Sequence, residues 1–151
     1  MVKIFYFLIR HRRSLFFGSI CTGLLKLLGL EIPNKVITGN NLKFPHLGGC
    51  IVIHPSTEIR DNVEIYHGVT IGRADVYNTW ADSKMEKIII EDGAILGAGS
   101  KILCKNGTLK VGKSSIIAAN SVLLNSTGDN EIWAGNPAKK VSIRRSKLCG
   151  K

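Results

Sequence analysis

The chain has 151 residues, a formal net charge of +10, and 44% hydrophobic and 21% charged residues. That length allows one domain, and this composition excludes an intrinsically disordered chain. The positive charge lies at the two ends, because residues 1–29 and 139–151 contain no acidic residue and residues 30–138 carry a net charge of −1. A nearly neutral body argues against a nucleic-acid-binding protein, which would present one basic face.

Two short apolar runs begin the chain, at residues 4–9 and 14–25, on either side of a basic cluster at residues 10–13. Neither run reaches the roughly 20 apolar residues that cross a membrane. Lys26 interrupts the second run and no A-x-A-like cleavage site follows, which argues against a signal peptide. We expect residues 1–35 to form a segment of short amphipathic helices. These helices either pack on the body or a partner subunit, or lie as a peripheral contact on an anionic membrane surface.

The four cysteines lack the spacing of a metal or disulfide framework. No CxxC pair and no paired histidine pattern occurs, so a zinc site is not expected. Free thiols in a reducing cytoplasm are the simplest interpretation, and a cytoplasmic protein is therefore predicted.

From residue 47 onward, an aliphatic residue recurs at every sixth position. The series comprises Leu47, Ile53, Ile59, Ile65 and Ile71, then Ile90, Leu96 and Ile102, and, after three extra residues, Val111, Ile117 and Leu123. A period of six fits neither a helix nor a simple strand. It predicts very short strands joined by tight turns, with every sixth side chain in one narrow core. The sequence therefore predicts an all-β solenoid over residues 36–143, an extruded loop at 73–87 and a basic tail at 144–151.

This repeat resembles that of the hexapeptide-repeat acyltransferases, and the resemblance covers residues 36–143. It implies a left-handed parallel β-helix of hexapeptide repeats. It also implies a homotrimer with active sites at the subunit interfaces. In that setting the loop at 73–87 would contact the acceptor, through residues that include Asp75, Tyr77, Trp80 and Asp82.

The segment LKFPHLGGCIVIHPSTEIRDNVEIYHGVTIG, residues 42–72, contains three of the four histidines. It resembles the start of the β-helix in serine acetyltransferases and in colanic-acid and capsule polysaccharide O-acetyltransferases. The resemblance implies that His46 is the catalytic base and that His67 is an acceptor contact or an alternative base. Serine acetyltransferases have an acidic residue directly before this histidine, whereas this chain has Pro45.

A histidine base suits the chemistry of acyl transfer. A neutral imidazole, with an ordinary pKa of about 6.5, can accept the proton of an acceptor hydroxyl and return it to the leaving thiolate. A covalent alternative would use Cys50 as the nucleophile. Its place in an aliphatic run favours a small buried hydrophobic residue instead. His54 precedes Pro55 at a turn and is interpreted as structural, and His11 as a solvated or lipid-facing charge.

Near the C-terminus, WAGNPAKKV at residues 133–141 resembles the G-x-P-A-basic-x-V/I ending of the same acyltransferases. The resemblance implies acetyl-CoA as co-substrate and requires no metal. Backbone groups around Gly72, Ala98 and Ala119 would line the pantetheine channel. Lys139 and Lys140 would face the nucleotide phosphates, for which point charges are suited.

Together these features predict an acetyl-CoA-dependent O-acetyltransferase that acts on a hydroxyl of a sugar or polysaccharide precursor. The first alternative is a serine O-acetyltransferase. Pro45, a loop without that family's second histidine motif, and the absence of a long helical N-terminal domain argue against it. A noncatalytic trimeric scaffold is a second alternative. A zinc-dependent carbonic anhydrase on the same fold is disfavoured, because His46, His54 and His67 do not have its short fixed spacing.

Overall fold

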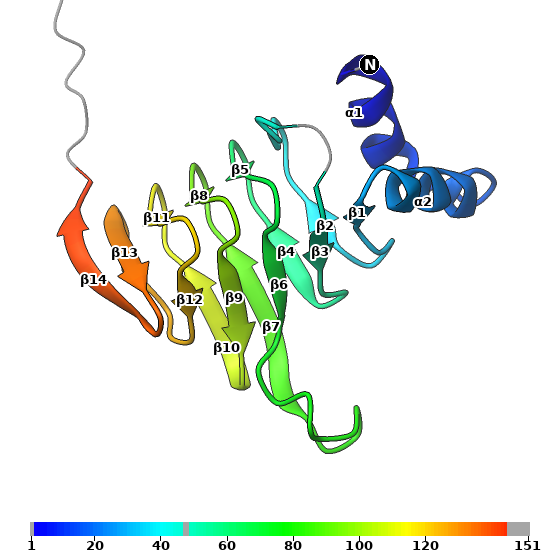
Figure 1. Cartoon of the computed structure of the whole chain (residues 1–151). Helices are drawn as coiled ribbons and strands as arrows, with labels where there is room; N and C mark the ends of the chain where they lie inside the picture. Colours follow the sequence, from blue (N-terminus) through cyan, green and yellow to red (C-terminus); the bar gives the residue numbers. More distant parts are fainter. Residues whose placement is uncertain (1, 47–48, 145–151) are drawn as a thin grey trace, which may run out of the picture.

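Two short helices lie at one end of the molecule (Figure 1). The computed structural model describes residues 2–46 and 49–144. Helix α1 spans Val2–His11 and helix α2 spans Gly18–Leu27. Each buries one face, with Leu8 and Ile9 on α1 and Cys21 and Leu25 on α2. None of the helices among these residues is both long and apolar enough to cross a membrane.

Strands begin earlier than the expected boundary at residue 36. Helix α2 ends at Leu27 because Gly29 adopts a φ of +79° and its N–H donates to the carbonyl of Lys26, an arrangement that terminates helices. Strand β1 (Leu30–Glu31) follows at once, and Leu30 is buried in the core. The last part of the predicted helical segment therefore belongs to the body.

The described residues form fourteen short strands in three sheets, and the chain passes through the sheets in turn (Figure 1). The first sheet contains β1 (Leu30–Glu31), β3 (Ile51–Ile53), β6 (Thr70–Arg73), β9 (Lys101–Cys104) and β12 (Val122–Leu123). The second contains β2 (Ile37–Thr38), β4 (Thr57–Ile59), β7 (Lys84–Ile90) and β10 (Asn106–Val111). The third contains β5 (Glu64–Ile65), β8 (Ile95–Leu96), β11 (Ile116–Ile117), β13 (Glu131–Gly135) and β14 (Ala138–Ile143). The described strand pairs are parallel, except that β14 runs antiparallel to β13.

The register of these pairs follows the six-residue repeat. Where the repeat is unbroken, Ile53 pairs with Ile71, so one coil through the three sheets contains three hexapeptides. The next coil is longer, because Ile71 pairs with Ile102 and the extruded loop lies between them. The coil after it is lengthened slightly, since Ile102 pairs with Leu123 and the extra residues of the repeat lie between them. The loop itself spans residues 74–83 and is shorter than predicted, since strand β7 begins at Lys84 and pairs with β10 from there.

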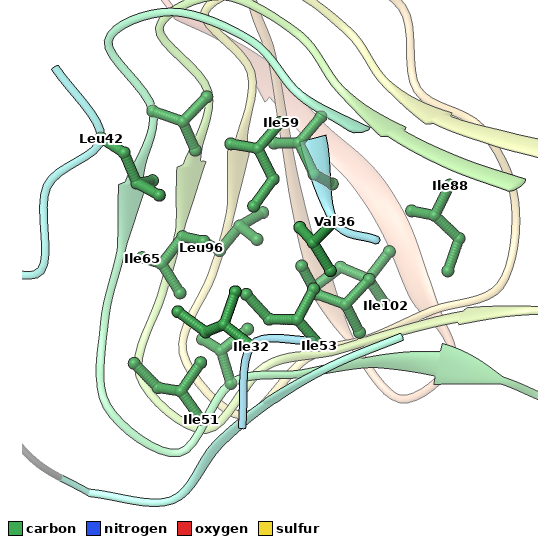
Figure 2. Packing of buried hydrophobic residues seen from close by; sticks show 14 of the residues in the cluster. Ile32, Val36, Leu42, Ile51, Ile53, Ile59, Ile65, Ile88, Leu96 and Ile102 are labelled. Carbon is green, nitrogen blue, oxygen red and sulfur yellow. The ribbon is translucent and has the colours of Figure 1, made fainter. Parts of the chain in front are cut away.

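The aliphatic residues of the repeat form the core. The labelled side chains in Figure 2 point into one narrow interior from strands of different sheets and from the turns between strands. Ile53, Ile59, Ile65 and Ile71 are all buried, as are their counterparts in the later coils. Full burial of such a side chain contributes roughly 1.5–3 kcal/mol. The prediction of a mostly β fold with parallel sheets is thereby confirmed.

Candidate active site

Two predicted site residues lie together on the surface of the early coils. His46 precedes β3 and His67 follows β5, and their ring centroids are 5.5 Å apart in an edge-on arrangement. The ring of Tyr66 lies 5.7 Å from that of His46. Both histidines are exposed, so an acceptor hydroxyl can reach either imidazole. The structure therefore places the two candidate bases in one site.

Gly49 allows this approach. Its carbonyl accepts a hydrogen bond of 2.6 Å from the N–H of Gly68, which joins the two histidine-bearing turns. A Cβ at position 49 would lie 3.0 Å from the Cβ of His67, and the φ of Gly49 is +121°. A residue with a side chain would meet His67 and adopt a strained backbone there. Gly49 thus sets the spacing between the turns.

Lys101 and Tyr66 also belong to this neighbourhood, and sequence reasoning missed both. The Nζ of Lys101 donates a 2.7 Å hydrogen bond to the carbonyl of Gly68, beside His67. Lys101 pairs with Thr70 on the neighbouring strand, and the extruded loop lies between the two residues in the sequence. The unbroken six-residue repeat therefore does not show that they are neighbours. Extending the repeat register across the loop would have found this lysine.

Cys50 differs from its prediction. Its side chain is exposed, not buried, although it directly precedes the buried residue Ile51. The reason is local, because Cys50 adopts a φ of +51° in the turn before β3 and does not share the alternation of that strand.

The extruded loop is anchored by contacts of its side chains with Arg73 at the end of β6 and with His54 after β3. Arg73 forms an ion pair of 3.3 Å with Asp75 and lies over the ring of Trp80, at 4.7 Å from its centroid. His54 stacks on the same indole, with the two ring centroids 5.2 Å apart. Burial and the nearby Arg73 lower the pKa of His54. Asp75 is buried and cannot act as the predicted acceptor contact, whereas Tyr77, Trp80 and Asp82 are exposed.

The residues predicted to bind the coenzyme lie on two parts of the surface. Ala98 and Ala119 occupy equivalent turns of successive coils, and the carbonyl of Ala98 accepts a 2.8 Å hydrogen bond from the N–H of Asn120. Gly72 lies on β6, in a different sheet. Within the described ranges, no three His, Cys, Asp or Glu side chains are grouped closely enough to hold a metal ion.

The two lysines near the C-terminus have different environments. The Nζ of Lys140 lies 2.7 Å from Oε1 of Glu131, whereas Lys139 has no ion pair among the described residues. The hydrogen bond from Lys140, with a second from Nε1 of Trp133, lowers the pKa of Glu131 to about 2. Arg144, the first residue of the predicted tail, donates to the carbonyls of Gly93 and Ser114. The rest of that tail lies outside the described residues.

Comparisons with known proteins identify the family. A serine acetyltransferase of Helicobacter pylori is 31% identical over 137 residues, which make up 89% of this chain and 75% of that protein. This chain belongs to the serine acetyltransferase family. The serine acetyltransferase of Haemophilus influenzae is 38% identical over 104 residues, or 69% of this chain and 36% of that protein. No protein-family model matches the chain.

Solved structures agree with the family. The serine acetyltransferase of Brucella abortus in complex with coenzyme A superposes with a TM-score of 0.69 and 29% identity, over 95% of this chain and 54% of that one. This chain spans between 31% and 46% of the length of three relatives that it matches.

These findings correct one prediction. A sugar or polysaccharide O-acetyltransferase was expected, but the relatives and the structural neighbours are serine acetyltransferases, which was the stated alternative. The prediction was wrong because it gave weight to Pro45 and to the missing histidine motif. Neither feature defines an acceptor pocket.

Proposed function

We propose that this chain is an acetyl-CoA-dependent O-acetyltransferase whose acceptor is the hydroxyl of serine, built on a left-handed β-helix. The observation that carries the proposal is the exposed pair His46 and His67, at 5.5 Å between ring centroids, on a chain of the serine acetyltransferase family. The bound coenzyme A named for the Brucella abortus relative supports acetyl-CoA as the co-substrate.

His46 acts as the general base in this proposal. It accepts the hydroxyl proton of serine while the hydroxyl oxygen attacks the thioester carbonyl carbon of acetyl-CoA. When the tetrahedral intermediate collapses, the carbon–sulfur bond breaks and His46 returns the proton to the coenzyme thiolate. The products are O-acetylserine and coenzyme A. His67 and Tyr66 flank the base and orient the acceptor, and His67 is the alternative base.

We propose the coenzyme contacts at Lys139 and Lys140, with backbone groups near Gly72, Ala98 and Ala119 along the pantetheine arm. Lys139 fits a phosphate contact, since it is exposed and has no ion pair within the part of the chain that the structure describes. Lys140 already forms an ion pair of 2.7 Å with Glu131, which partly neutralises its charge toward a phosphate. We therefore expect Lys139 to contribute more to coenzyme affinity.

We also propose that the protein is a homotrimer that touches the cytoplasmic membrane surface through α1 and α2. The helices and their connections expose large apolar side chains at Ile4, Phe7, Leu15, Phe16, Phe17, Ile20, Leu24, Leu27 and Leu28. Leu15 is fully exposed and Phe16 is 89% exposed. Basic residues accompany them and no acidic residue lies among residues 1–29, which matches an anionic lipid surface.

A coenzyme-release assay tests the enzymatic proposal. The full chain with acetyl-CoA should release the coenzyme thiol in the presence of L-serine, and D-serine and free hexoses should stay near the background rate. Replacing His46 by Gln should remove the serine-dependent rate. If the full chain binds coenzyme A but releases no coenzyme thiol from acetyl-CoA in the presence of L-serine, serine is not its acceptor.

A further inference from the structure

Arg12 is a buried cation without a carboxylate partner among the described residues. It is 1% exposed. Its Nη atoms donate to the carbonyls of Ile9, at 2.6 Å, and Val36, at 2.5 Å, and lie 3.4 Å from the hydroxyl of Thr38. Its Nε–H has no hydrogen-bond partner there. Neutral acceptors alone compensate poorly for the desolvation of a charge.

The charge of Arg12 persists at neutral pH. Burial, with a smaller contribution from the nearby Arg13, lowers the pKa of Arg12 to about 10. The guanidinium is therefore still protonated near pH 7. An anion close to it would offset the unfavourable burial.

Arg12 lines a cavity of about 740 Å³ between the end of α1 and the first coil. Arg10 and Arg13 line the same cavity, and Lys43 with the turn at residues 38–42 forms its opposite side. Arg10 and Arg13 are exposed and have no ion pair in the described ranges. The cavity thus gathers three guanidinium groups and one ammonium group.

Few acidic groups balance these cations. Glu64 lies 3.5 Å from the ammonium of Lys43. The carboxylate of Asp61 accepts a 2.6 Å hydrogen bond from the backbone N–H of Asn40. No carboxylate among the described residues pairs with the three arginines, so the cavity keeps an excess of positive charge and of hydrogen-bond donors.

We propose that this cavity binds the phosphate group of a phosphomonoester or phosphodiester. Phosphate has several acceptor oxygens, and the exposed planar guanidinium groups of Arg10 and Arg13 can each bind two of them at once. The buried Arg12, whose Nη atoms already donate to backbone carbonyls, adds its positive charge behind them. The site is separate from the proposed acetyl transfer, because none of its lining residues belongs to the His46 and His67 pair. The phosphate belongs either to a soluble metabolite or to a lipid headgroup beside the apolar surface of α1 and α2.

Binding of inorganic phosphate and glycerol 3-phosphate to the full chain tests the site. At constant ionic strength, calorimetry should detect both ligands, and chloride should give no signal. The double variant R10Q/R13Q should bind at least about tenfold more weakly, a loss of about 1.4 kcal/mol. Both arginines are exposed, so this variant should keep the wild-type melting temperature. The control K26Q/K35Q removes the same charge outside the cavity and should bind phosphate normally.

Vesicles distinguish the two sources of phosphate. If the ligand is a lipid headgroup, vesicles with phosphatidylglycerol should bind the chain, lose binding in R10Q/R13Q far more than in K26Q/K35Q, and compete with glycerol 3-phosphate. If the ligand is soluble, R10Q/R13Q and K26Q/K35Q should bind vesicles alike. The proposed site would be overturned if both variants bound inorganic phosphate with equal affinity, or if the wild type did not bind it. Acetyl transfer to serine, measured in parallel, reports on the proposed function separately.

Discussion

At the scale of single residues, the arrangement of His46 and His67 decides how the proposed chemistry can be divided. The two rings meet edge-on, so one imidazole can hold the acceptor while the other takes its proton. His46 stands directly after a proline and before a Gly-rich turn, and it cannot rely on an acidic residue at position 45. Whichever group orients its ring must come from elsewhere in the site.

His46→Gln should lower kcat by about 10²–10⁴-fold, which is the typical contribution of general-base catalysis to the rate. The dissociation constant for coenzyme A should not change, because the amide keeps the size of the side chain and leaves Lys139 and Lys140 intact. Steady-state kinetics with calorimetry would measure both values. His11→Gln serves as the control, since His11 lies on α1 and should leave both values unchanged. A normal kcat in the His46 variant would move the base to His67.

Cys50→Ser should retain most of the activity, because the exposed thiol is not needed when a histidine activates the acceptor directly. The assay is the same coenzyme release, together with mass spectrometry of the protein after incubation with acetyl-CoA. A large loss of activity, with an acetyl group on Cys50 in the wild type, would indicate a covalent route.

The sequence alone supports only part of this site. The resemblance of the motif around His46 predicted this histidine as the base, and the structure brings His67 beside it. Lys101 was missed because its position depends on a coil that the extruded loop lengthens. The exposure of Cys50 was missed because a single left-handed residue reverses the alternation expected of a strand.

At the scale of elements, an ion pair between Lys140 on β14 and Glu131 on β13 links these two paired strands. Its bond to Glu131 lowers the pKa of that carboxyl to about 2, against an ordinary value of 4.5. A carboxylate with a depressed pKa stabilises the fold above pH 4.5. Its contribution disappears as the pH falls toward 2.

Lys140→Met should therefore lower the melting temperature at pH 7, and the difference from the wild type should shrink between pH 4.5 and pH 2. Lys139→Met is the matched control on the same strand, with no ion pair among the described residues, and should melt like the wild type at both pH values. It should instead raise the KM for acetyl-CoA. If the difference in melting temperature between Lys140→Met and the wild type did not change with pH, the pKa of Glu131 would not depend on this lysine.

The connection between α1 and α2 is the most exposed apolar part of the described chain. The double variant Phe16→Ser and Phe17→Ser should lose binding to vesicles that contain phosphatidylglycerol, because it removes large side chains that would enter the lipid interface. Vesicle flotation measures this. Val76→Ser and Tyr77→Ser in the extruded loop also remove exposed apolar side chains and should bind normally. If light scattering shows that the Phe variant has lost an oligomer instead, the surface contacts another subunit.

At the scale of the whole molecule, the proposed trimer has a simple test. Light scattering of the full chain should give three times the chain mass of 16.5 kDa. The expectation rests on the resemblance of residues 36–143 to the hexapeptide-repeat acyltransferases, which implies a homotrimer. A monomer with full acetyltransferase activity would contradict an active site shared between subunits.

The fold was predictable at this scale because the core repeats. Every sixth residue from Ile53 to Ile71 has the same buried environment, so periodicity alone predicts the short strands. The pairing of every third repeat, as between Ile53 and Ile71, was implied by the resemblance. The loop boundary was less predictable, since β7 begins to pair with β10 at Lys84, before the repeat resumes. The acceptor was predicted wrongly because the hexapeptide pattern specifies the fold and does not specify which acceptor is bound.

The two ends of the stack have a further consequence, for assembly. A column of parallel strands has open edges at both ends, and such edges can recruit another chain and grow into a fibre. Helix α2 packs against β1 at one end. At the other end β14 turns back antiparallel along β13 and contacts β12. Both outer strands of the first sheet, β1 and β12, are therefore in contact with another element, which hinders the addition of a strand from a second chain to this sheet.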